Sequence, residues 1–217
     1  MNRTFKLNRL IATLLICALA QAGFSQTLKD VFTNSESPIV YLGIDFSKAK
    51  LLGDGNPDEI RNNLYRSINQ LIIYEPKKYD LSGAFHKGTI DNDINPVAKK
   101  NEKANINEIL STNSSDFNRF KESDISSMVK DLDLSGKKGI GLLFVMEAMR
   151  KVDKKGDAAV WVTLLDMGTK KVLMTERIES KASMAIGFRN YWASTIRNLI
   201  ETIEKNKYKE WKSKYSS

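Results

Sequence analysis

The chain has 217 residues, a formal net charge of +8 and 41% hydrophobic residues, which is typical of a globular protein and excludes a disordered or fibrous one. Its one cysteine, Cys17, excludes a disulfide framework and a cysteine metal cluster. Its one histidine, His86, is too few for the usual transition-metal sites. We therefore expect a protein without a cofactor.

The first 25 residues have the three-part layout of a secretory signal peptide. Arg3, Lys6 and Arg9 make the start positive, and an apolar run follows at 10–20. This run is too short to span a bilayer, which needs about 20 apolar residues. We predict that residues 1–25 are removed and that the mature protein is periplasmic or secreted.

Cys17 offers an alternative to simple cleavage, namely lipid anchoring. Leu14 stands three residues before Cys17, as in bacterial lipoproteins. However, the preceding residue, Ile16, is large where a small residue is usual, and Cys17 lies inside the apolar run. We favour cleavage over an anchor at Cys17.

The start of the mature chain contains a polar stretch, a strand and a helix. Residues 26–36 are predicted to be a polar tether in front of a single domain at 37–205. The segment 38–46 alternates apolar side chains, which predicts a strand with one buried face. A helix follows, with Asn56 as N-cap and Pro57 at its first position.

The middle of the chain has few periodic signals. Residues 87–122 are rich in Asn, Asp, Lys and Ser, and are predicted to form a long polar excursion. A short strand is expected between residues 79 and 90. A helix is expected from Ser123, because apolar residues then recur at helical spacing.

Three apolar segments, 139–149, 158–166 and 171–178, follow with short turns between them and predict an antiparallel meander. A long amphipathic helix is expected at 187–205, followed by a basic, aromatic tail at 206–217. The predicted order is β-α-(β)-α-β-β-β-α. It indicates an α/β (α+β) two-layer sandwich, with the meander packed by the last helix.

Several segments carry a resemblance to exported proteins. Ile39–Phe46 (IVYLGIDF) and the turn at Asp166–Leu173 (DMGTKKVL) resemble segments of the superfamily of TolB N-terminal domains and curli-secretion lipoproteins. Gly139–Val145 and Gly187–Trp192 are similar to a group of exported proteins of Bacteroidota. The resemblance implies an exported α/β domain that works without catalysis, as an adaptor or assembly component of the envelope. It transfers no binding residue.

The polar excursion contains a candidate calcium site. Asp91, Asp93, Asn95 and Glu102 have the spacing of positions 1, 3, 5 and 12 of an EF-hand loop. Pro96 occupies the position where the loop needs glycine for a sharp turn. This favours a solvated polar loop, and a calcium site of another type is the alternative.

A hydrolase is the catalytic alternative. Asp45, His86 and Glu147 would be its catalytic groups if the fold gathered them in one cleft. The sequence has no G-x-S-x-G motif, and the pair Gly139 and Gly141 opens a strand instead of a nucleotide-binding loop. We therefore expect no enzymatic activity.

The C-terminal tail contains Tyr208, Trp211 and Tyr215 at spacings of three and four, which would place them on one face of a helix. Among the surrounding lysines, this face is a candidate for binding a partner or for peripheral contact with an anionic membrane. Nucleic acid is not expected to be a partner, because the protein is predicted to be exported.

These patterns together favour an exported, non-enzymatic envelope protein. We expect it to bind another envelope protein through the open edge of its sheet or through the excursion at 87–122. The alternatives are the hydrolase and a periplasmic domain that binds calcium or another ligand through the excursion.

Overall fold

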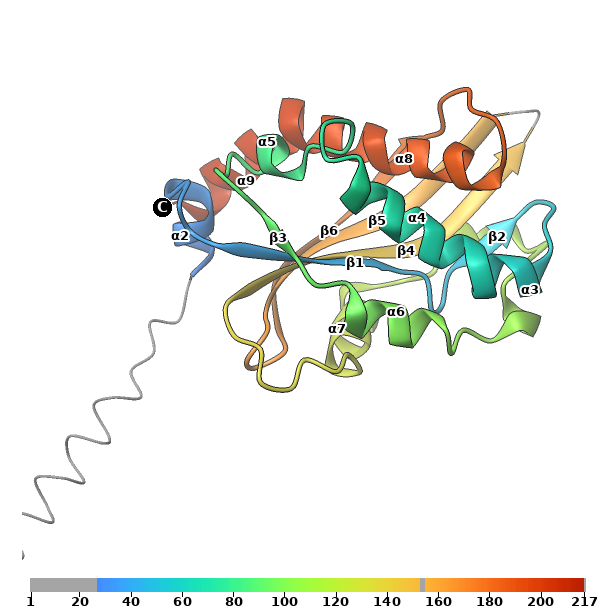
Figure 1. The fold of residues 1–217 in the computed structure, drawn as a ribbon, viewed down its shortest axis with the longest axis horizontal. Helices are drawn as coiled ribbons and strands as arrows, with labels where there is room; N and C mark the ends of the chain where they lie inside the picture. Colours follow the sequence, from blue (N-terminus) through green and yellow to red (C-terminus); the bar gives the residue numbers. More distant parts are fainter. Residues whose placement is uncertain (1–26, 153–154, 217) are drawn as a thin grey trace, which may run out of the picture.

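A computed structural model describes residues 27–152 and 155–216 (Figure 1). The strands are β1 (Ile39–Asp45), β2 (Lys50–Leu52), β3 (Asp91–Asn92), β4 (Ile140–Val152), β5 (Lys155–Asp166) and β6 (Lys171–Lys181). The helical segments are α2 (Leu28–Thr33), α3 (Pro57–Glu59), η1 (Ile60–Leu64), α4 (Tyr65–Tyr74), α5 (Leu81–Ala84), α6 (Asn95–Asn101), η2 (Ile106–Glu108), η3 (Ser114–Asn118), α7 (Glu122–Lys130), α8 (Phe188–Thr202), η4 (Ile203–Lys207) and α9 (Tyr208–Tyr215).

The strands form one mixed sheet in the order β3-β1-β4-β5-β6, with β2 beside the far end of β4. β1 runs parallel to β3 and β4, whereas β4, β5 and β6 pair antiparallel. The predicted α/β fold class and its C-terminal meander are confirmed. The first ten residues of β4 are buried, which explains why this strand is an almost continuous apolar run.

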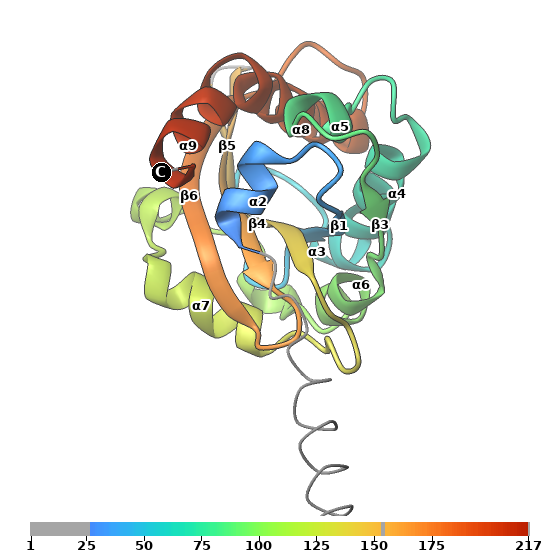
Figure 2. The ribbon, with the colours of Figure 1, turned by 90° about the vertical axis from the view of Figure 1, so that its left-hand side faces the viewer.

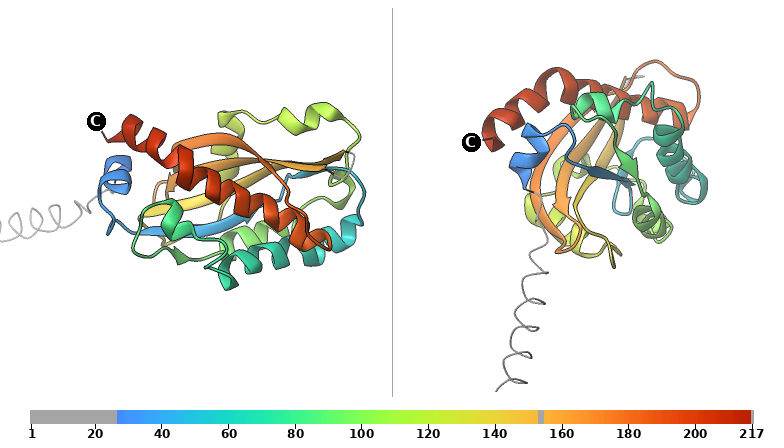
Figure 3. Two further views of the ribbon diagram at one scale, coloured as in Figure 1. Left: turned by 90° about the horizontal axis from the view of Figure 1, so that it is seen from above. Right: turned by 60° about the vertical axis from the view of Figure 1, so that its left-hand side comes forward.

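Helices cover both faces of the sheet. On the first face, α4 and α8 pack over a core that includes Ile68, Phe144 and Leu199 (Figure 3). On the second face, α6 and α7 place Val97 and Met128 in a separate cluster with strand residues. This second helical layer is an addition to the sandwich that the sequence predicted.

The expected tether at 26–36 contains a helix. Thr27 caps α2, and Val31 and Phe32 are buried. The Phe32 ring packs against the C-terminal helix, 5.7 Å from the ring of Tyr208. Two apolar residues in a polar stretch are enough to fix this segment on the domain, although they show no periodicity in the sequence.

The polar excursion at 87–122 is also more ordered than predicted. It contains β3, α6, η2 and η3, and it buries Val97, Phe117 and Phe120. The strand expected between residues 79 and 90 is absent from that described segment, which contains α5. The short strands are β2 and β3 instead, and each has only two or three residues.

The last helix does not end at Lys205. It continues through η4 and α9 to Tyr215, so 206–217 is not a separate tail as far as it is described. The apolar spacing of Ile203, Tyr208 and Trp211 keeps the same side of the helix in the core.

The predicted signal peptide at 1–25 and Cys17 lie outside the described residues. Within the described ranges, no helix combines the length and the apolar character needed to cross a bilayer.

Removing the Phe32 ring tests how firmly α2 is fixed. Phe32→Ala should lower the free energy of unfolding by about 3–5 kcal/mol, since it deletes a buried ring from an aromatic cluster. Urea unfolding followed by circular dichroism measures this. Thr33→Ala is the matched control, because Thr33 is exposed. If both variants unfold like the original protein, α2 contributes nothing to the domain.

Candidate functional site

Asp45 is a buried structural carboxylate at the end of β1. Lys100 of α6 donates to it at 2.8 Å and also donates to the backbone oxygen of Met128 at 2.8 Å. The backbone N–H of Ser47 donates to the other carboxylate oxygen at 2.8 Å. Asp45 therefore connects β1 to both helices of the second face.

Glu147 is equally buried, in the middle of the sheet. One carboxylate oxygen accepts the backbone N–H groups of Arg119 and Phe120. The other accepts the indole N–H of Trp161 at 3.1 Å and the Nε of Arg177 at 2.7 Å. Four donors occupy the carboxylate, so Glu147 holds the 119–120 segment against β5 and β6 and is not placed to take a proton from a substrate.

The structure does not bring the three predicted catalytic residues together. Asp45 and Glu147 contact the second helical layer, whereas His86 lies after α5 and stacks on Tyr208 on the first face, with ring centroids 4.0 Å apart. None of the three lines any of the five main cavities of the described residues. The geometry of a hydrolase site is therefore missing at Asp45, His86 and Glu147.

The candidate calcium ligands are also separated. Asp93 pairs with Lys137, and the hydrogen bond from this lysine holds the pKa of the Asp93 carboxyl below its usual value. Glu102 pairs with Arg66 at 2.6 Å, beyond the far end of α6. Asp91 lies in β3, and Asn95 is the first residue of α6. In the described part of the chain, no three acidic or histidine side chains converge as metal ligands would.

The aromatic side chains of the C-terminal helix do share one face, but this face is turned inward. Tyr208 and Trp211 are buried, and Tyr215 stacks on Phe32 with ring centroids 5.8 Å apart. The Trp211 indole N–H donates to Glu176 of β6 at 2.5 Å. Tyr208, Trp211 and Tyr215 therefore fix the helix to the domain and do not form a face for a partner or a membrane.

The β1 edge of the sheet is closed by the protein itself. β3 pairs with its first half, and two asparagine side chains take over where β3 ends. Asn69 of α4 accepts from the N–H of Ile44 at 2.7 Å and donates to its carbonyl at 3.1 Å. Asn101 of α6 donates to the same carbonyl at 2.9 Å and accepts from the N–H of Phe46 at 2.7 Å.

Gly43 makes this closure possible. Its φ of +97° lies in the left-handed region, and the pairing of β1 with β4 shifts at this point. A Cβ at this position would be 2.7 Å from the Asn69 Oδ1. Only glycine lets the amide approach the strand so closely.

The opposite border of the sheet is formed by β6, which pairs with no further described strand and lies between α7 and α9 (Figure 2). The backbone N–H of Ala182 donates to the carbonyl oxygen of Gly156 in β5 at 2.7 Å. From Ala182 backwards along β6, every second residue therefore turns its backbone N–H and C=O toward β5. Since inward and outward backbone groups alternate, Thr175, Arg177 and Glu179 direct theirs outward. No described residue hydrogen-bonds to the backbone of these three.

The side chains along the open edge are mostly charged, as is common where a strand is exposed to water. Glu179 and Lys181 are exposed, whereas Arg177 reaches back to Glu147. The charges limit self-association; Thr175 and Arg177 are half-buried, so the exposed part of this edge is at Glu179 and Lys181.

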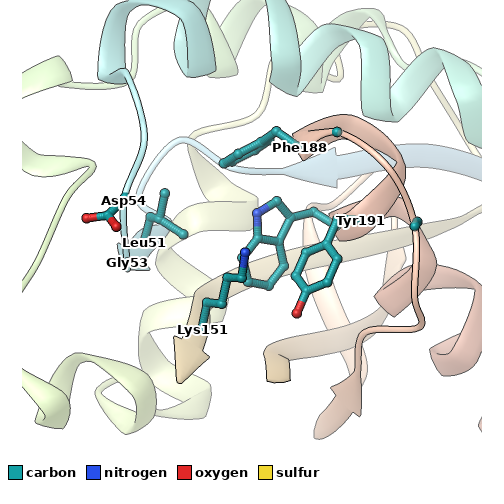
Figure 4. A pocket seen from close by; sticks show the side chains of 9 residues that line it. Leu51, Gly53, Asp54, Lys151, Phe188 and Tyr191 are labelled. Carbon is teal, nitrogen blue, oxygen red and sulfur yellow. The ribbon is translucent and has the colours of Figure 1, made fainter. Parts of the chain in front are cut away.

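Figure 4 shows a separate cavity of about 250 Å³ at the far end of the sheet. Phe188 and Tyr191 of α8 form one side, and Leu51 lies on the other. Lys151 and Asp54 are its charged lining residues, and the Lys151 ammonium lies 5.2 Å from the centre of the Tyr191 ring. The cavity is smaller than the roughly 300–1,000 Å³ of most ligand sites, and its lining has no nucleophile beside a base.

Comparisons with known proteins add little to this geometry. No family model and no curated protein matches the chain. A hypothetical protein from Chlamydia trachomatis has a TM-score of 0.33 and 12% identity, over 82% of this chain and 95% of that one. A putative neuraminyllactose-binding hemagglutinin homolog from Helicobacter pylori has a TM-score of 0.30 and 9% identity, over 83% and 91%.

The structural role of Glu147 can be tested against a catalytic one. Glu147→Gln should lower the free energy of unfolding by about 3–5 kcal/mol, because a glutamine amide offers one acceptor oxygen to the four donors around the buried carboxylate and removes its charge from the pair with Arg177. Glu179→Gln is the matched control: Glu179 binds the same arginine from an exposed position and should cost less than about 1 kcal/mol. Equal stabilities in urea titrations would refute the structural role of Glu147.

Proposed function

We propose that this is an exported, non-enzymatic envelope protein that binds an extended segment of another envelope protein along the open edge of β6. The observation that carries the proposal is the difference between the two sheet borders. Asn69 and Asn101 close the β1 edge, whereas the outward backbone groups of Thr175, Arg177 and Glu179 have no partner among the described residues.

Strand addition suits such an edge. An added segment would pair with the outward N–H and C=O groups of β6, and this backbone pairing would supply affinity whatever its sequence. Its alternate side chains would meet the exposed Glu179 and Lys181, so oppositely charged residues at matching positions would supply specificity.

The exported, periplasmic or secreted location rests on the N-terminal sequence, with its positive start and short apolar run. The absence of catalysis is supported by Asp45 and Glu147, whose carboxylates are occupied by structural donors. A calcium-binding role is disfavoured by the separation of Asp93 from Glu102 across α6.

Proline at position 179 tests strand addition. Glu179→Pro removes one outward N–H and leaves the β5–β6 ladder intact, so the variant should fold. It should lose photo-crosslinks to an envelope protein from a benzophenone side chain placed at Lys181. Crosslinking in the native envelope, followed by mass spectrometry, measures the effect.

The matched control is Glu179→Ala, which removes the same carboxylate but keeps the N–H, and it should retain the crosslinks. A benzophenone at Lys103, which is exposed on another part of the surface, controls for random collisions. If Glu179→Pro crosslinks as strongly as Glu179→Ala, or if Lys103 gives the same products, the edge of β6 is not the binding site.

A further inference from the structure

The far end of the molecule carries apolar side chains that the fold leaves in water. Met184 is fully exposed and Ile186 is 91% exposed, both on the 182–187 connection between β6 and α8. Val152, at the end of β4, is 57% exposed. We call these three residues the apolar tip. Exposed aliphatic side chains that gather at one place usually mark a contact surface.

The three residues belong to one end of the fold. The 182–187 connection starts beside the β4–β5 hairpin, where the N–H of Ala182 binds Gly156, and Val152 pairs with Lys155 in the same hairpin. The hollow between the hairpin and the connection is lined by Lys155 and Met184. Figures 1 and 3 show both segments projecting at the same end of the sheet.

Four positively charged side chains lie on the segments next to the apolar tip. Lys151, Lys155, Lys181 and Arg189 are exposed, and none of them forms an ion pair with a described residue. The neighbouring Asp157 is neutralised by Arg150 at 3.1 Å. Among the residues that line the two cavities at this end, Asp54 is then the one acid without an ion-pair partner, and the exposed Asp58 and Glu59 follow it in α3.

We propose that the apolar tip inserts into the surface of an anionic lipid bilayer while the four cations bind its headgroups. A small group of aliphatic side chains ringed by lysine and arginine matches such a surface in both polarity and charge. Each cation near an anionic surface raises membrane partitioning by about fivefold. This contact does not depend on β6 strand addition, and Lys181 is the one residue that belongs to both surfaces.

A protein partner fits the tip less well. A stable protein interface buries about 1,200–2,000 Å² around a packed core. The tip has only three aliphatic side chains on two protruding segments, with charged residues between them. A fluid lipid surface can accommodate such isolated projections without a complementary shape.

Vesicle sedimentation tests the proposal. The chain should bind vesicles of phosphatidylcholine with phosphatidylglycerol, and should bind pure phosphatidylcholine much less. The double variant Met184→Ser/Ile186→Ser should bind the anionic vesicles at least about tenfold less, since a buried aliphatic side chain is worth about that factor. Val172→Ser, which changes a half-buried side chain at the opposite end of β6, is the apolar control and should leave binding unchanged.

Two triple variants that remove equal charge test whether binding requires the cations near the apolar tip. Lys155→Gln/Lys181→Gln/Arg189→Gln should reduce binding strongly, whereas Lys103→Gln/Lys209→Gln/Lys212→Gln removes the same charge from exposed positions elsewhere and should reduce it much less. All proteins keep the same N-terminus, so binding through residues 1–25 is common to all of them.

A fluorescent label gives a second measurement. In a Cys17→Ser background, an environment-sensitive dye on Ile186→Cys should shift to the blue with anionic vesicles, while the same dye on Ser135→Cys, an exposed position at the opposite end of β4, should not. Equal loss in the two charge variants, unchanged binding of Met184→Ser/Ile186→Ser, or no blue shift at position 186 would each overturn the proposal. Loss of envelope crosslinks in the tip variant without loss of vesicle binding would instead indicate a protein partner.

Discussion

Backbone hydrogen bonding at the borders of the sheet is the constraint on which the rest of this fold depends. A sheet has two edges, and each edge presents N–H and C=O groups that need partners. At β1, the fold meets this need with the amides of Asn69 and Asn101, and Gly43 gives Asn69 room to approach. This closure positions α4 and α6 on opposite sides of the strand. At β6 no comparable backbone closure exists within the described ranges, and we propose that a partner strand supplies it.

The buried acids explain why the interior is an unpromising place for chemistry. Asp45 connects β1 to α6 and α7, and Glu147 gathers donors from β5, β6 and the 119–120 segment. Each carboxylate replaces lost hydration with several charge-assisted hydrogen bonds, which is the condition under which a buried charge is tolerated. These residues fix the second helical layer on the sheet.

The sequence predicted those parts of the fold that depend on local periodicity. The meander followed from three apolar segments with turns between them, and Asn56 and Pro57 correctly marked a helix start. The roles of Asn69 and Asn101 could not be predicted, because their partner Ile44 lies 25 and 57 residues away. The spacing of the C-terminal aromatic residues predicted their shared face correctly. It did not reveal that α2, hidden in an apparently polar tether, covers that face.

Residue-resolved amide hydrogen exchange tests the open edge most directly. In the isolated protein, the amides of Thr175, Arg177 and Glu179 should exchange fast, while those of Met174, Glu176 and Ile178 should be slow because they bond to β5. Adding the solubilised envelope of the source organism should slow the three fast amides and leave the other three unchanged. Protection of Thr175, Arg177 and Glu179 in the isolated protein, or continued fast exchange with the envelope present, would contradict the account.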